Sequence, residues 1–146
     1  MSNVGGSASL LDGTGVATIT DDDSAPTISV NDTTISEGDA GSFAVTLTNA
    51  VTGNVTVSYV LVGVTATSGI DYTYTGGTAT IVAGSTGATI AVTTIEDAIY
   101  EGTESFQIIL SNVGGSASLL DGTGVATITD DDSAPQITIN NINITE

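Results

Sequence analysis

Carboxylates are the side chains of this sequence that could do chemistry, and many of them gather in four short segments, SEGD, SGIDY, EDAIYEGTE and DDD. Nine acidic residues in these segments form the candidate site: Glu37, Asp71, Glu96, Asp97, Glu101, Glu104, Asp130, Asp131 and Asp132. The chain of 146 residues holds 17 Asp and Glu but no Lys, Arg, His or Cys, so its formal charge of −17 has no internal counterion. A ligand set made only of oxygen selects hard cations, Ca²⁺ or Mg²⁺, over zinc or copper.

Close packing of several carboxylates would distinguish a metal site from an ordinary acidic turn. Taken alone, the DDD segment is typical of a solvated turn. Two unit charges about 4 Å apart repel by roughly 4 kcal/mol at an effective dielectric near 20, so a group of carboxylates is unfavourable without a cation. Ca²⁺ accepts about six to eight oxygens with flexible geometry, which such a group can supply. Taken together, EDxxxExxE, GxDY and DDD therefore predict Ca²⁺ as the cofactor.

The same composition excludes several classes of function. Nucleic acid and anionic membrane surfaces attract Lys and Arg, so we expect neither as a partner. No apolar run approaches the roughly 20 residues that span a bilayer, so we expect no membrane insertion in this fragment. Without His, Cys or Lys the chain lacks a usual general base, a thiolate and a Schiff-base amine. A paired-carboxylate glycosidase would need an aromatic cleft, and there is no Trp, so we expect no enzyme activity.

An internal repeat sets the domain organisation. Residues 2–26 recur letter for letter as residues 111–135, which gives a period of 109 residues. This period is too long for a solenoid, whose units of about 20–50 residues share their cores, and it suits self-sufficient domains in tandem. We interpret residues 1–26 as the C-terminal strand fragment of a preceding repeat. Residues 27–135 are then a complete domain with its linker, and 136–146 the first strand of a following repeat.

Alternation of apolar and polar residues with period two predicts an all-β domain. Examples are Phe43, Val45 and Leu47, which would share one face of a strand. Clusters of Gly, Asn, Ser and Asp, among them NVGGSASLLDGTG, are expected to be turns. The predicted strands cover residues 27–31 (resuming at 33–36), 43–47, 55–61, 77–83, 86–95, 104–112 and 124–129. About seven short strands indicate an immunoglobulin-like antiparallel β-sandwich.

Such a sandwich would bring the acidic segments together. The strands predicted at 86–95 and 124–129 can end at the same pole as the loop that holds Asp71. The nine carboxylates would then crowd that pole. Two acidic outliers belong elsewhere: residues 21–23 repeat the DDD triplet for the preceding domain, and Glu146 would begin the site of the following one.

Four segments resemble the Calx-beta domain: ISEGDAGSFAVTL, TATSGIDYTY, IEDAIYEGTESFQIIL and GVATITDDD. That family is a calcium-binding β-sandwich of sodium/calcium exchangers and many bacterial surface proteins, and the resemblance covers residues 27–132. It implies that the nine carboxylates match acidic calcium-binding positions and that Ile99 offers its backbone carbonyl as a ligand. Glu96 and Ala98 depart from the family, because the exchanger motif carries Asp at both positions.

The repeat, the charge and the resemblance together predict a calcium-binding structural repeat of a long extracellular or cell-surface fibre or adhesin. Ca²⁺ would stabilise the domain and, through residues 130–132, stiffen the joint formed by the linker at 133–135. The expected partners are neighbouring identical repeats or subunits, with any specific adhesion left to a distinct terminal domain. One alternative is a regulatory calcium sensor. Another is a protomer that assembles head to tail through its terminal strands, predicted at 15–20 and 137–141.

Overall fold

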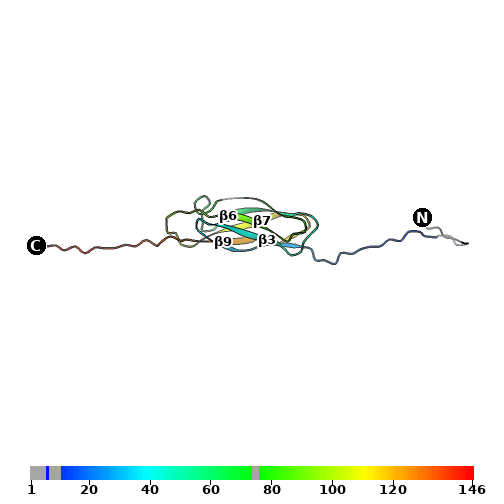
Figure 1. Cartoon of the computed structure of the whole chain (residues 1–146), viewed down its shortest axis with the longest axis horizontal. Helices are drawn as coiled ribbons and strands as arrows, with labels where there is room; N and C mark the ends of the chain where they lie inside the picture. Colours follow the sequence, from blue (N-terminus) through cyan, green and yellow to red (C-terminus); the bar gives the residue numbers. More distant parts are fainter. Residues whose placement is uncertain (1–5, 7–10, 74–75) are drawn as a thin grey trace.

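The computed structural model describes residues 6, 11–73 and 76–146 and folds the middle of the chain into a two-layer β-sandwich (Figure 1). The strands of the described residues are β1 (Thr27–Val30), β2 (Thr33–Ser36), β3 (Ala40–Leu47), β4 (Val55–Gly63), β5 (Gly77–Ile81), β6 (Gly87–Thr93), β7 (Glu104–Gly114), β8 (Ser118–Asp121) and β9 (Thr123–Thr129). Within these residues, no helix is long and apolar enough to cross a membrane.

The strands form two sheets, one with the order β6-β3-β1-β8 and the other with the order β2-β9-β7-β4-β5. This arrangement confirms the predicted all-β, immunoglobulin-like sandwich. Neighbouring strands are antiparallel, as predicted, except that β1 pairs with β8 and β2 pairs with β9 in parallel.

The parallel pairs arise because two long strands each change sheets halfway. β1 and β2 are separated at Asn31 and Asp32, and β8 and β9 at Gly122. Side chains take over backbone hydrogen bonding at the crossing: the Val125 N–H donates to Asp32 Oδ1 at 2.8 Å, and the Ala44 N–H donates to Asn31 Oδ1. Since the two composite strands run side by side in the same direction, they pair in parallel in both sheets.

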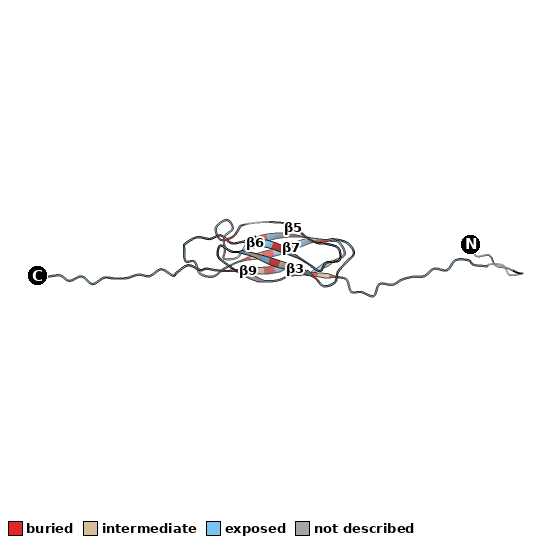
Figure 2. Ribbon diagram, in the orientation of Figure 1, coloured by how far each residue is buried: buried red, intermediate tan, exposed pale blue. Residues whose placement is uncertain are grey.

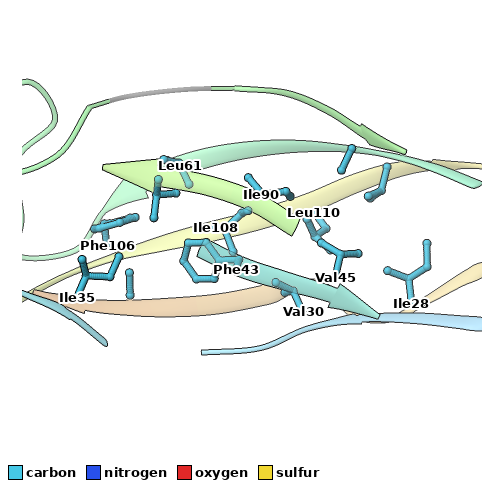
Figure 3. Close-up of a cluster of buried hydrophobic side chains, with 14 of the residues drawn as sticks. Ile28, Val30, Ile35, Phe43, Val45, Leu61, Ile90, Phe106, Ile108 and Leu110 are labelled. Carbon is cyan, nitrogen blue, oxygen red and sulfur yellow. The ribbon is translucent and has the colours of Figure 1, made fainter. Parts of the chain in front are cut away.

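The core lies between the sheets and is built from the inward residues of the alternating strands (Figures 2 and 3). Phe43, Val45 and Leu47 on β3 are buried, and so are Phe106 and Ile108 on β7. Burying one such side chain contributes about 1.5–3 kcal/mol before the entropic cost of folding. Alternation with period two therefore fixes which face of each strand enters the core.

An aromatic stack joins this core to the loop that precedes β5. The rings of Tyr72 and Phe106 are stacked with their centroids 4.2 Å apart, and Phe43 meets Phe106 edge-on at 6.2 Å. Tyr72 is only 1% exposed although it lies outside the named strands. Its burial holds the neighbouring Asp71 at one end of the sandwich.

We predicted that the segment NVGGSASLLDGTG forms turns, and this prediction is wrong in part because the segment also contains strand residues. Its beginning extends β7 to Gly114, and β8 follows a tight reversal at Gly115, whose φ is +97°. None of the four residues of β8 is buried, so Leu119 and Leu120 show no alternation that could reveal the strand. The split of the first strand and this edge strand explain why the described residues form nine strands where about seven were predicted.

Two extended segments leave opposite ends of the sandwich (Figures 1 and 2). Among their described residues, 11–26 and 130–146, none belongs to a strand. Val16, Ile19 and Ile137 are 94%, 95% and 94% exposed. The strands predicted here at 15–20 and 137–141 would need neighbouring repeats as partners, so they and the proposed domain boundaries stay predictions.

Candidate metal centre

The predicted acidic pole exists at the end of the sandwich from which the C-terminal segment leaves (Figure 1). Glu37 directly follows β2, Glu104 begins β7, and residues 130–132 directly follow β9. The parallel pairing of β2 with β9 sets Ser36 opposite Thr129, so the two strands end together. A backbone hydrogen bond of 3.0 Å from Glu37 N to Thr129 O closes this end.

Three overlapping groups of carboxylates form the centre, and within each group one oxygen per residue lies within 4.8 Å of the others. The groups are Glu37, Asp130 and Asp132; Glu37, Asp97 and Glu101; and Asp71, Glu101 and Glu104. Glu37 belongs to two groups and Glu101 to two. The centre is therefore a continuous row of acids rather than separate surface pairs.

Asp130 is held rigidly by backbone donors of the loop between β6 and β7. Its Oδ2 accepts the N–H groups of Glu101 and Gly102, each at 2.7 Å, and its Oδ1 accepts the N–H of Asp132 at 2.8 Å. The hydrogen bond from Gly102 is the main reason that the pKa of Asp130 is lowered. Gly102 has φ +83°, a conformation that favours glycine, so the glycine of YEGTE serves the site.

Asp71 reaches the centre from a loop tied to both sheets. It is 7% exposed, and its carboxylate accepts the N–H of Thr67. Its backbone carbonyl accepts the N–H of Ile95 at 2.9 Å, and the stacked ring of Tyr72 follows it. These contacts place Asp71 beside Glu104. Glu104 itself lies two residues before Phe106, which belongs to the core.

Two residues that sequence reasoning missed position the loop at 95–103. Thr94 is buried, and its hydroxyl donates to the carbonyls of Ser36 at 2.8 Å or Asp39 at 2.9 Å. Gly38 has φ +74°, and a Cβ there would lie 2.4 Å from Glu96 Oε2. The glycine in SEGD was a visible signal for this close approach, whereas nothing local marks Thr94.

Repulsion and burial disturb the acids of the centre in the direction expected for a site without a counterion. Burial, a hydrogen bond with Asp71 and the charge of Asp71 raise the pKa of Glu104 to about 7. Burial, followed by the charge of Asp97, raises the pKa of Glu37. Burial also raises the pKa of Glu101 and of Asp132. The arrangement therefore favours uptake of protons or of a cation.

The donor set fits a hard divalent cation. Every candidate ligand is an oxygen, and the chain supplies no Lys, Arg or His to neutralise it. Among the described residues, Asp132 Oδ2 is a buried side-chain oxygen without a hydrogen-bond partner. A buried carboxylate oxygen without a donor is costly unless a cation binds it.

The remaining predicted ligands lie around the three groups without joining them. Glu96 is exposed, and its pKa is raised chiefly by the charge of Asp131, which is also exposed. Ile99 is 62% exposed, and its N–H donates to Asp97 Oδ1 at 2.7 Å. The structure therefore brings together seven of the nine predicted carboxylates, and the ligand roles of all ten residues stay predictions.

Fold and site together define a class of protein: a β-sandwich domain with a row of carboxylates at one pole. A family model described as the Calx-beta domain matches residues 21–133, so the chain belongs to the Calx-beta family. A search of the curated proteins found no match to this sequence.

Solved structures show the same fold. The crystal structure of the apo form of the Calx CBD1 domain has a TM-score of 0.68 and 21% identity, over 75% of this chain and 100% of that one. The calcium binding domain CBD12 of CALX1.1 has a TM-score of 0.68 and 24% identity, over 82% of this chain and 52% of that one. The Calx CBD2 domain has a TM-score of 0.64 and 15% identity, over 72% of this chain and 86% of that one.

Proposed function

We propose that this chain is a calcium-binding structural repeat of a long extracellular or cell-surface fibre or adhesin. The observation that carries the proposal is the row of three overlapping carboxylate groups in a chain with no cationic side chain. A similar structure is described as a calcium binding domain, which supports Ca²⁺ as the ion. Membership of the Calx-beta family supports the same choice.

Ca²⁺ suits the centre better than Mg²⁺. Mg²⁺ needs near-ideal octahedral geometry at about 2.0–2.1 Å and keeps several of its waters, whereas Ca²⁺ accepts irregular sets of about six to eight oxygens. The acids here come from four different segments of the chain, and the groups share members. A row of this kind offers many oxygens and little octahedral symmetry.

The linker has contacts that suit a stiff joint. At the N-terminal joint, Pro26 is buried and its carbonyl accepts the N–H of Ser118 at 3.0 Å. The Thr27 N–H donates to Thr48 Oγ1 at 2.9 Å. The end of the linker is thus fixed to the domain that follows it. At the C-terminal joint, Ca²⁺ bound to Asp130 and Asp132 would fix the beginning of the linker at 133–135 to the domain before it.

The two alternatives fit less well. A sensor needs a partner domain of different sequence to receive its signal, and the repeat supplies an identical one. A protomer joined through its two ends would combine copies of β8 and β9 with copies of β1 and β2 only. The joint would lack β3, β4 and β7, which carry much of the core. A covalent array of complete domains has no such deficit, and no enzyme activity is proposed.

Small-angle scattering of a chain of several 109-residue repeats, with Ca²⁺ and with chelator, tests the proposed role. We expect an extended rod in Ca²⁺ and a wider spread of inter-domain angles in chelator. An Asp132→Asn change in every repeat should give the flexible state even in Ca²⁺. Equal stiffness in all three samples would contradict the role of the ion as a brace of the joint.

A further inference from the structure

We propose that the N-terminal segment at 12–23 can replace residues 121–132 in the sandwich of a second copy of this chain, so that copies join head to tail by strand exchange. The two segments are identical in sequence. This proposal concerns the chain of 146 residues as a separate molecule and does not depend on calcium binding; in the proposed array, residues 12–23 would instead close the preceding repeat. The proposal depends on the contacts that residues 121–132 make within the sandwich and on the exposure of residues 12–23.

Residues 121–132 close the sandwich. β9 lies between β2 and β7, and its Ala126 and Ile128 are 0% and 4% exposed. The Val125 N–H donates to Asp32 Oδ1 at 2.8 Å, and the Asp130 carboxylate accepts two N–H groups of the loop before β7. Because the letters are the same, the N-terminal segment could form each of these contacts in another molecule.

In this chain the described residues of the N-terminal copy lie outside the sandwich (Figure 1). Val16 and Ile19, which match Val125 and Ile128, are 94% and 95% exposed, and Leu11 is 99% exposed. No described residue of 11–26 belongs to a strand. The donor therefore exposes a strand-forming segment without unfolding its own domain. Exposed segments of this kind commonly pair with other chains.

The direction of the strands favours a second copy over closure within one chain. The parallel pairings of β1 with β8 and of β2 with β9 put Thr27 and Thr129 at opposite ends of the sandwich. Residues 27–36, which run along it, extend roughly 30 Å at about 3.3 Å each. The segment at 21–26 gives seven Cα steps from Thr20 to Thr27, which reach at most about 25 Å when fully extended. It cannot return from the pole where Thr20 would end to the start of β1 in the same chain.

The donor's linker gives the exchanged assembly the geometry of a tandem array. Residues 21–26 are identical to residues 130–135, which would lead into a following repeat. The donor's domain would therefore sit where the next repeat of an array sits. A chain's own β9 competes at an effective concentration of about millimolar, so exchange needs high concentration or a damaged β9.

An Ile128→Asp variant of the full chain tests the proposal, because it puts a charge in the core and disables the chain's own closing strand. We expect most of the protein to be folded and to run as dimers and longer oligomers in light scattering, each sandwich closed by the N-terminal segment of another copy. The matched Ile19→Asp variant should be a folded monomer. The double variant should be an unfolded monomer.

An Ile128→Asp chain that stays monomeric, or oligomers that persist in the double variant, would overturn the proposal. A second measurement avoids damage to the core. Unaltered chains unfolded and refolded at millimolar concentration should include dimers, and Ile19→Asp chains treated alike should not. Only monomers in the first sample, or equal dimers in both, would also overturn it.

Discussion

Two identical segments of this chain, residues 12–23 and 121–132, have different structures. In the second, Ile128 is 4% exposed within the sandwich and Asp130 accepts two backbone N–H groups of a neighbouring loop. In the first, the matching Ile19 is 95% exposed and, among the described residues, Asp21 accepts only the N–H of Asp23, at 3.0 Å. Local propensity is the same in both, so tertiary partners alone make the difference. The pair provides an internal control for every residue of the closing strand.

The largest contrast is expected from removing a core side chain. Ile128→Ala should reduce the free energy of unfolding by about 2–5 kcal/mol, because it leaves a cavity between the sheets. Ile19→Ala, in the exposed copy, should change it by less than about 0.5 kcal/mol. Urea denaturation of both variants measures the difference. Similar losses would mean that the N-terminal segment is packed against the domain after all.

The next contrast concerns the metal centre. Asp132→Asn should remove most of the stabilisation by Ca²⁺, which is about 2.7 kcal/mol at a hundredfold excess over Kd, because Asp132 shares a carboxylate group with Glu37 and Asp130. The matched Asp23→Asn should leave that stabilisation intact. Thermal melting with and without Ca²⁺ compares them. Equal losses would show that Ca²⁺ only screens diffuse charge.

A glycine pair tests how closely the closing strand is packed. A Cβ on Gly124 would lie 2.5 Å from Asn31 O and 3.1 Å from Ile108 Cγ2, whereas a Cβ on the matching Gly15 would meet nothing within 4 Å. Gly124→Ala should therefore lower the free energy of unfolding by about 1–3 kcal/mol. Gly15→Ala should be neutral in the same urea titration. A neutral Gly124→Ala would mean that the crossing at Asn31 relaxes easily.

A further effect on stability is expected from pH. The pKa of Glu104 is raised from its ordinary value of 4.5 to about 7, so in chelator the folded state binds a proton more tightly than the unfolded state. Its contribution to stability is complete below pH 4.5 and is lost as pH rises through about 7. Urea midpoints measured across this window should fall with rising pH, and Glu104→Gln should flatten the fall. A rise over the same window would contradict the assignment.

The parts of the fold that the sequence predicts are those where one face of a strand is buried. β3 and β7 alternate apolar and polar residues because only one face enters the core. β8 could not be predicted, because both of its faces are exposed. The two parallel pairs also escaped prediction. They depend on hydrogen bonds such as Val125 N–H to Asp32, between residues far apart in the chain.

The composition of the candidate site was predictable, but its internal arrangement was not. Strand ends bring the acidic segments to one pole, which the sandwich topology already implied. The triplet at 130–132 divides, however: Asp130 and Asp132 enter one group with Glu37, whereas Asp131 is exposed. Successive side chains of an extended chain point to opposite sides, so three adjacent acids cannot all face the centre. Of the two supporting residues, Gly38 had a visible signal in SEGD, whereas the contacts of Thr94 are marked by no motif.

The central claim is that the row of carboxylates binds Ca²⁺ in the folded state. Thermal unfolding of the full chain in millimolar Ca²⁺, in millimolar Mg²⁺ and in chelator tests it most directly. We expect Ca²⁺ to stabilise the domain by about 2.7 kcal/mol at a hundredfold excess over Kd, with Mg²⁺ giving much less. Melting curves that coincide in Ca²⁺ and in chelator would contradict the claim.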